Sequence, residues 1–589
     1  MKYPILSELS TSREMIERFG GYNHNLRIGD GEFYEMTNLT SDDYPILSPR
    51  AQRGVYASPE NPQGLISKDS LCYVDGSDFV INEYRVDTKL STAAKDCPKT
   101  LVSMGGYVII MPDKVWVNTT PKPDGSFEFD NIEATVTTKT DTTFTHCKLD
   151  GTDYSQENIT YDTTAPADPE DLDYWIDMST VPHTLKQYSA KSAMWVAVAT
   201  TYIKISATGI GAPFAVGDGV KISGVKIDEL ADLNSTMIIQ GRDDNYIIVI
   251  GIIDQVKTQA AASPITIKRQ MPNMDFIIES ENRLWGCRYG LSVDGEFVNE
   301  IYASKLGDFK NWYSFEGIST DSYAASLGTD GQFTGAITHL GYPLFFKETC
   351  MHKVYGNYPA NYHIQTTSCR GVQKGSEKSL AIVNEVLYYK ARSGICSFDG
   401  SLPTEISSAL GDVPYGKAVA GTLGNKYYVS MQDANEQYHF FVYDTLKGMW
   451  HREDNTQAME FCNCRGELYY IDHAYNQIKT VKGSGIKDAS PVKWEAVTGV
   501  IGTDSPDKKY ISRLDVRMKL THGARVYFYV QYDSAGEWVQ LYAMDGITLK
   551  SFSVPIRPKR SDHFRLKIVG EGEAKIYSIC KTIEQGSDL

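Results

Sequence analysis

The sequence predicts an all-β protein with a β-propeller core, an inserted small β domain and a C-terminal β-sandwich. Two observations lead to this prediction. Short apolar runs joined by tight turns recur at a spacing of roughly 35–45 residues, which is the length of a four-stranded propeller blade. The 589 residues also include 38 Tyr, 48 Gly and 23 Pro. Tyr favours strands, whereas Gly and Pro favour turns.

The clearest repeat unit is the run FFVYDTLKGMW at residues 440–450. An apolar strand ends at Tyr443-Asp444, a turn follows at Leu446-Lys447-Gly448, and Trp450 closes the unit. One such unit cannot bury both faces of its sheet, so several must stack around a common axis. The repeats diverge in sequence, and a meandering β-sandwich would give similar hairpins.

The chain divides into five predicted segments. They are 1–65, an N-terminal arm with the first strands; 66–119, the first part of the propeller; 120–271, an inserted acidic β domain; 272–485, the second part of the propeller; and 486–589, the C-terminal β-sandwich. In the arm, Ser10 to Ser12 can cap a helix, and Met15, Ile16 and Phe19 have helical spacing. We therefore expect a short helix there. The last hundred residues alternate apolar and polar positions, as in YISRLDVRMKL at 510–520, which is typical of a sandwich.

Charge is unevenly distributed. The formal net charge is −16, and residues 124–174 hold 13 acidic against two basic residues. Tight DNA binding needs clustered Lys and Arg, so an acidic chain better suits a conduit through which DNA slides, or simply a solvated surface. We predict an acidic lumen or interface surface at Asp168, Glu170, Asp171 and Asp173.

Basic residues cluster near the C-terminal end of the chain. This cluster consists of Arg557, Lys559, Arg560, Arg565 and Lys567, with Arg513, Arg517 and Lys519 on an earlier strand. It is a candidate contact with the DNA backbone, a contact with a neighbouring subunit, or a solvated face.

No sequence motif of an enzyme stands out. The chain has no GxxxxGK[ST], HExxH or GxSxG pattern. Two turns, Ser292–Gly295 and Ser397–Gly400, resemble the Asp-box of sialidases without its following Gly-x-x-Trp. Cys462, Cys464 and His473 lack an evident fourth metal ligand. We therefore predict no enzyme activity, no catalytic, cofactor-binding or metal residues, and no cofactor. No apolar run reaches the ~20 residues of a membrane span, so we expect a soluble, unprocessed protein.

Three stretches resemble tail nozzle and packaged-DNA-stabilisation proteins of tailed bacteriophages. They are NEIYASKLGDFKNWYSF at 299–315, the opening segment at 25–50, and the C-terminal segment at 556–579. Together they bracket nearly the whole chain, but the region 120–270 has no counterpart. None of the three is a catalytic motif, so they indicate a family more than a role.

The resemblance implies a β-propeller protein that assembles with itself into a ring, often a hexamer, below the portal and adaptor proteins. Such a nozzle ring retains the packaged genome and conducts it at ejection. The expected partners are the portal and adaptor, tail fibres or tail-tip proteins, and transiently the genome. The expected location is the virion tail, after assembly in the host cytoplasm. Two alternatives remain: a glycan-binding or glycan-cleaving propeller at the tail tip, and a hub or tip component of a siphophage tail.

Overall fold

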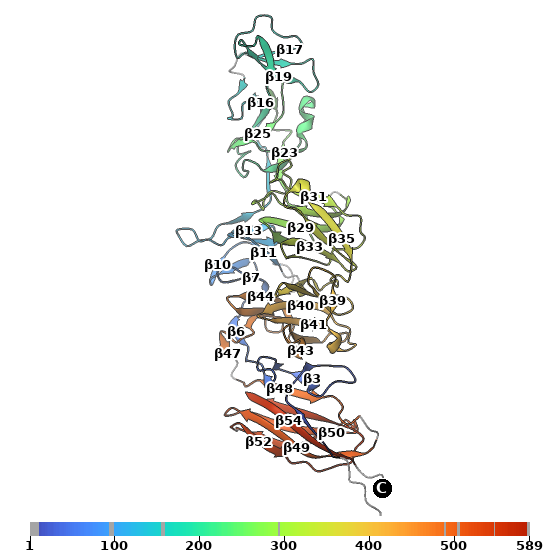
Figure 1. Cartoon of the computed structure of the whole chain (residues 1–589). Coiled ribbons are helices and arrows are strands. Elements are labelled where there is room, and N and C mark those ends of the chain that lie inside the picture. Colours follow the sequence, from blue (N-terminus) through green and yellow to red (C-terminus); the bar gives the residue numbers. More distant parts are fainter. Residues whose placement is uncertain are drawn as a thin grey trace, which may run out of the picture.

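The computed structural model describes residues 11–92, 99–154, 159–292, 295–487, 490–503, 507–546 and 548–585. It is built almost entirely of strands, and its three units follow one another along a single long axis (Figure 1). The inserted domain lies at one end, the propeller in the middle, and the sandwich at the other end. The predicted all-β class with a propeller core is confirmed.

Seven blades make up the propeller within the described residues. The first blade has β7 (Pro62–Ser67), β8 (Leu71–Asp75), β9 (Asp78–Ile81) and β10 (Tyr84–Val86). The second has β11 (Thr100–Met104), β12 (Tyr107–Met111), β13 (Val115–Asn118) and β14 (Phe129–Asn131). The third has β28 (Phe276–Ser280), β29 (Arg283–Leu291), β30 (Phe297–Ala303) and β31 (Tyr323–Ser326). The fourth has β32 (Gly335–His339), β33 (Tyr342–Lys347), β34 (Cys350–Tyr355) and β35 (His363–Ser368), with the 3-10 helix η3 (Pro359–Asn361).

The remaining three blades complete the circle. The fifth has β36 (Ala381–Val383), β37 (Val386–Lys390), β38 (Ile395–Phe398) and β39 (Thr404–Glu405), flanked by η4 (Glu377–Ser379) and η5 (Ser408–Leu410). The sixth has β40 (Gly416–Leu423), β41 (Lys426–Gln432), β42 (Tyr438–Asp444) and β43 (Met449–Arg452). The seventh has β44 (Ala458–Cys464), β45 (Glu467–Asp472) and β46 (Gln477–Thr480), which are joined by β6 (Gly54–Ala57) and β47 (Ile486–Lys487).

Hydrophobic clusters between neighbouring blades hold the circle together. One cluster joins blades one and two around Phe79 and Ile110, and another joins blades seven and one around Leu71 and Ile471. The first strands of successive blades are neighbours, so they lie innermost. Glu460 on innermost strand β44 forms an ion pair with Lys378 of η4 at 2.9 Å. Burial raises the pKa of Glu460. This pair occupies space between innermost elements of the propeller.

Ring closure depends on a strand from the other end of the chain. β6 pairs with β46, so residues near the N-terminus complete the last blade. A Cβ added at Gly54 would lie 2.0 Å from the carbonyl oxygen of Ser484. We expect Gly54→Ala to lower the free energy of unfolding by about 1–3 kcal/mol, because the closing strand must shift. Denaturant unfolding measures this effect. Gly328→Ala is the control, since no atom lies within 4 Å of its added Cβ, and equal stability of the two variants would contradict the prediction.

The inserted domain leaves the second blade after Asn131, because β14 still pairs with β13; the chain therefore leaves the propeller later than residue 120. Its strands form three sheets. The strands are β15 (Ala134–Thr137), β16 (Thr142–Cys147), β17 (Ile159–Asp162), β18 (Tyr174–Asp177), β19 (Thr184–Ser189), β20 (Met194–Ala197), β21 (Tyr202–Ser206), β22 (Gly219–Ser223), β23 (Thr236–Ile238), β24 (Gly241–Asp243), β25 (Tyr246–Ile250), β26 (Lys257–Gln259) and β27 (Thr266–Arg269), with the 3-10 helix η2 (Asp228–Leu233). Two sheets enclose one core that includes Phe144, Ile222 and Ile267. The third sheet, β17 to β20, forms the tip (Figure 1).

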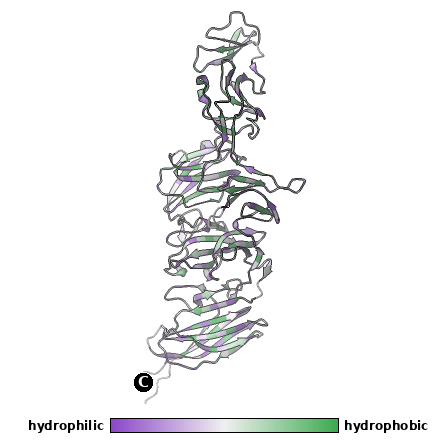
Figure 2. Ribbon diagram, turned by 180° about the vertical axis from the view of Figure 1, so that it is seen from behind, coloured by the Kyte–Doolittle hydropathy of each residue, from purple (hydrophilic) through white to green (hydrophobic). Residues whose placement is uncertain are grey.

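The sandwich contains strands from both ends of the chain. Its strands are β1 (Thr11–Ile16), β2 (Gly21–Tyr22), β3 (Glu32–Thr37), β48 (Lys493–Thr498), β49 (Lys509–Leu520), β50 (Arg525–Tyr532), β51 (Val539–Asp545), β52 (Lys550–Val554), β53 (Phe564–Glu571) and β54 (Ala574–Gln585), beside the small pair β4 (Leu39–Thr40) and β5 (Ser48–Pro49). One sheet has the order β1-β54-β49-β52. The other continues through β3 and β2 into blade six, which makes a ten-stranded sheet. The ribbon colours alternate between hydrophilic and hydrophobic along these strands (Figure 2).

The expected N-terminal helix is wrong. Residues Thr11–Ile16 form β1, which pairs antiparallel with β54. Helical spacing of Met15, Ile16 and Phe19 was a short-range signal, and pairing with a strand more than 560 residues away overrides it. Ile16 and Phe19 are nevertheless buried in the sandwich core.

Candidate functional site

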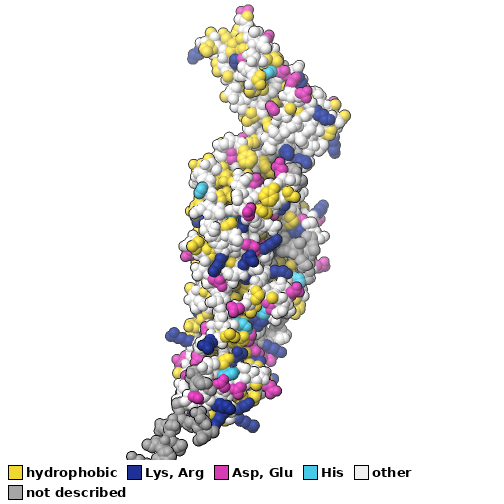
Figure 3. Space-filling view, turned by 90° about the vertical axis from the view of Figure 1, so that its right-hand side faces the viewer, with side chains coloured by type: hydrophobic (Ala, Val, Ile, Leu, Met, Phe, Trp, Pro, Cys, Tyr) yellow, Lys and Arg dark blue, Asp and Glu magenta, His cyan; other side chains and the backbone are white. Residues whose placement is uncertain are grey.

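The junction between insert and propeller, here called the neck, brings together three stretches of chain. Two are the crossings that enter and leave the insert, from β14 to β15 and from β27 to β28. The third is the loop at 304–322 between β30 and β31, which contains most of the NEIYASKLGDFKNWYSF run. Figure 3 shows the molecule narrowing at this level.

A buried polar network spans the neck. Arg269 of the insert donates to Asp218 at 2.6 Å and to the carbonyl of Ile132 at 3.0 Å. Asn311 of the propeller donates to the same Asp218 at 2.9 Å and accepts from the backbone N–H of Gly219 at 3.0 Å. Asp218, Arg269 and Asn311 are each at most 5% exposed. Buried charges that are paired and hydrogen-bonded favour one geometry, so we expect this network to hold the insert against the propeller.

Aromatic residues of the 299–315 run pack in the propeller next to this network. Phe309 and Trp312 pack with Trp116 and Met271 in the core between blades two and three. Trp312 donates to the carbonyl of Phe309 at 2.9 Å. A Cβ at Gly219 would lie 2.3 Å from the carbonyl oxygen of Tyr313, so the two backbones are in direct contact. The run that carries the family resemblance therefore builds the joint between two units.

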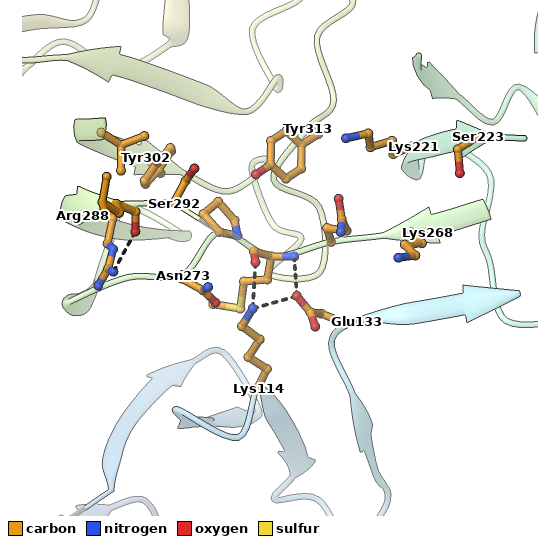
Figure 4. A pocket seen from close by; sticks show the side chains of 15 residues that line it. Lys114, Glu133, Lys221, Ser223, Lys268, Asn273, Arg288, Ser292, Tyr302 and Tyr313 are labelled. Carbon is orange, nitrogen blue, oxygen red and sulfur yellow. Dashed lines mark hydrogen bonds and ion pairs between the residues drawn. The ribbon is translucent and has the colours of Figure 1, made fainter. Parts of the chain in front are cut away.

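A pocket of about 620 Å³ opens beside this network (Figure 4). The insert contributes Lys221, Ser223 and Lys268 to its wall. The propeller contributes Lys114 and Arg288, together with Tyr302 and Tyr313. Glu133 is the acidic residue among the lining side chains. No local pattern in the sequence indicates this site, because Lys221 and Lys268 are neighbours only through the pairing of β22 with β27.

The predicted acidic residues lie on the loop between β17 and β18, at the tip of the insert. Asp168, Glu170 and Asp171 are exposed and Asp173 is half-buried. Two of them hold turns: Asp173 accepts from the N–H of Glu170 at 2.8 Å, and Asp171 accepts from the N–H of Ala190 at 2.7 Å. The structure thus brings the four residues together, far from the neck. Their role at a lumen or interface stays a prediction.

The predicted basic residues fall into two groups on the sandwich. Arg557, Lys559 and Arg560 are exposed on the loop before β53, and Arg565 and Lys567 lie on β53 itself. Lys567 lies 3.4 Å from Glu495, and the Arg565 guanidinium lies 4.7 Å from the Tyr34 ring centroid. In contrast, Arg513, Arg517 and Lys519 lie on the exposed face of β49 in the other sheet.

A buried histidine in the insert is expected to lower its stability in acid. His146 on β16 is 4% exposed, and neither of its ring nitrogens has a hydrogen-bond partner. Burial lowers the pKa of His146 from 6.5 to about 4. The unfolded chain therefore binds a proton as the pH falls below 6.5, whereas the folded chain does not until about pH 4. Stability is full above pH 6.5 and is lost as the pH falls toward 4.

We expect His146→Phe to reduce this acid sensitivity. Between pH 7.5 and 5, the variant should lose about 2 kcal/mol less stability than the wild type, because the depressed titration is gone. Hydrogen exchange of β16 as a function of pH measures the effect in the insert. His183→Phe, at a less buried position in the same domain, is the matched control. Identical profiles of His146→Phe and the wild type would contradict the assignment.

Neither metal clusters nor apolar spans were found in the described ranges. No group of three or more His, Cys, Asp and Glu side chains there is placed to hold a metal ion. None of the helices in the same ranges is long and apolar enough to cross a membrane. Of the two turns similar to an Asp-box, Asp294 lies outside the described residues. Asp399 accepts from the N–H of Ser401 at 3.0 Å, and this hydrogen bond lowers the pKa of its carboxyl.

No protein-family profile and no curated protein matches the sequence. Among solved structures, the chain is similar to an exo-β-1,3-galactanase from Phanerochaete chrysosporium, at 11% identity over 52% of this chain and 94% of that chain, with a TM-score of 0.21. It is also similar to BamB from Moraxella catarrhalis, at 11% identity over 76% and 97% of the two chains, with a TM-score of 0.26. At such identities the likeness concerns the fold alone.

The prediction that the chain is not an enzyme is corrected. Several of the similar structures are glycoside hydrolases, including the galactanase above. The fold of this chain therefore does not exclude enzyme activity. Their TM-scores are near 0.2, so they point to no reaction and no catalytic residue in this chain.

Proposed function

We propose that this chain is a structural protein of a tailed-bacteriophage tail, a subunit of a nozzle ring below the portal and adaptor. One observation carries the proposal: two of the three segments that resemble nozzle proteins lie at joints between units, and the third pairs with one of these two. Residues 299–315 build much of the neck. Residues 25–50 run between propeller and sandwich, and residues 556–579 form the sandwich strands that meet the N-terminal segment.

The joint between propeller and sandwich is as tightly built as the neck. Arg53 donates to Glu453 at 2.7 Å and lies 2.9 Å from Asp454. Arg50 of the same segment lies 3.3 Å from each of these carboxylates. With the ten-stranded sheet that crosses the joint, this cluster is expected to hold propeller and sandwich in one arrangement. A rigid, elongated subunit suits a wall element that must keep its shape while DNA passes.

We infer that the DNA conduit lies between copies of the chain and not along the propeller axis. This inference rests on the Lys378–Glu460 ion pair, which lies among the innermost elements of the propeller. In such a ring, the exposed carboxylates of Asp168, Glu170 and Asp171 would repel phosphates where they face the lumen. Basic side chains of the sandwich, seen at its end in Figure 3, would contact the DNA backbone or a neighbouring subunit.

Binding to the connector tests this proposal. The purified full chain is mixed with portal–adaptor rings of the phage that encodes it, and the complexes are separated by sedimentation. We expect the chain to sediment with the rings in a fixed ratio, and portal rings lacking the adaptor serve as the control. A chain that stays free in this mixture but binds or cleaves host surface glycans would contradict the nozzle role and support the tail-tip glycan alternative.

A further inference from the structure

The neck pocket carries two lysines that the fold places face to face. Lys221 on β22 and Lys268 on β27 are directly opposite in the antiparallel register. Their strand neighbours Ile222 and Ile267 point into the core of the insert, so both lysines stand on the other face of the sheet. Like charges directly opposite each other destabilise a sheet. Neither ammonium has a hydrogen-bond or ion-pair partner among the described residues.

The other charges around the pocket are already paired. Glu133 accepts from Lys114 at 2.7 Å and from the N–H of Met271 at 3.2 Å. Arg288 donates to Asp275 at 2.6 Å, outside the pocket lining. Lys221 and Lys268 therefore remain without a counter-charge, in a cavity that also holds the cations Lys114 and Arg288. Lys221 is exposed and Lys268 is half-buried, so the excess positive charge lies in an open pocket whose walls come from the insert and the propeller.

The pocket also offers neutral hydrogen-bond donors. Ser223, Ser292 and Asn273 line it, and the Tyr313 ring faces it from the neck loop (Figure 4). Figure 4 shows the Lys221 side chain extending toward Tyr313. Ammonium groups together with hydroxyl and amide donors match a compact, multiply charged oxyanion, whose oxygens accept several charge-assisted hydrogen bonds.

We propose that the neck pocket binds a phosphate-type oxyanion between Lys221 and Lys268. The bound anion neutralises the opposed lysines and links the insert sheet to the propeller wall. The same chemistry is offered by a free phosphate or pyrophosphate and by the backbone phosphates of a nucleic acid. This site is independent of the nozzle role, because it rests only on the charges and shape of the pocket.

Calorimetric titration of the full chain at low ionic strength tests the site, with inorganic pyrophosphate in one arm and a short single-stranded oligothymidylate in the other. We expect saturable binding in at least one arm, and the arm that binds identifies the source of the phosphate. The double variant Lys221→Gln/Lys268→Gln should weaken binding at least about tenfold, since two charge-assisted contacts are lost. Lys191→Gln/Lys226→Gln is the matched control, because it removes the same charge at exposed positions of the insert outside the pocket. Absence of binding in both arms, or equal binding by the two double variants, would overturn the proposal.

A single substitution separates binding from structure. Lys221→Glu places a carboxylate opposite Lys268, so the unliganded insert should melt at the same or a higher temperature than the wild type. The same variant should lose pyrophosphate and oligothymidylate binding. A lower melting temperature with binding retained would assign Lys221 a purely structural role and overturn the site.

Discussion

Replacing Asp218 by alanine should lower the free energy of unfolding of the insert by about 3–5 kcal/mol, because it leaves the buried charge of Arg269 without its carboxylate partner. Arg269, whose side chain is 6% exposed, would lose its carboxylate partner. The same substitution would remove the Asp218 carboxylate that accepts from Asn311. Asn311 would then be held less firmly as the acceptor of the Gly219 N–H. We expect the insert to unfold before the propeller in this variant.

Hydrogen exchange followed by mass spectrometry resolves this effect by region. Exchange should rise over β15, β22 and β27 and stay unchanged in the sandwich. Asp244→Ala is the matched control: its partner Arg242 is 34% exposed, and exposed pairs contribute about 0–1 kcal/mol. If Asp218→Ala and Asp244→Ala had equal effects, the network would not be what fixes the neck.

Trp494→Ala should destabilise the joint between propeller and sandwich by about 3–5 kcal/mol, the usual cost of removing a fully buried aromatic side chain. Trp494 is 2% exposed on β48, the strand that carries the ten-stranded sheet into the sandwich. Its ring occupies the space over Gly570, where an added Cβ would lie 2.1 Å from the ring, and its N–H donates to Gly572 at 3.1 Å. The cavity would open in the core that also contains Phe33 and Phe564.

Denaturant unfolding followed by tryptophan fluorescence measures this loss. Trp538→Ala is the control in the same unit, because Trp538 is half-buried and its ring is covered by Lys567 at 5.2 Å. We expect the control to lose much less stability. A small loss of stability in both variants would contradict the prediction that Trp494 stabilises the joint.

Local patterns predicted much of the fold. Alternation in YISRLDVRMKL survives as the single long strand β49, with Leu514, Val516 and Met518 buried on one face. The run at 440–450 lies in β42 and β43 of blade six, where Trp450 is buried. Such signals are local, because the side-chain period of a strand is set within a few residues.

These local patterns could not predict the pairing of strands that are far apart in the sequence. Met15 and Ile16 have helical spacing but lie in a strand that pairs with β54. β6 closes blade seven, and no sequence pattern near residue 54 indicates this pairing. The neck shows the same limit. Asp218, Arg269 and Asn311 are unremarkable polar residues in the sequence, and only the fold brings them within hydrogen-bonding distance.

The mass of the purified full chain in solution, measured by mass photometry, tests the central claim most directly. The chain itself has a mass of 65.7 kDa. A nozzle subunit should give a discrete closed assembly at a fixed multiple of this mass, alone or on portal–adaptor rings. A stable monomer in both conditions would contradict a channel-ring role.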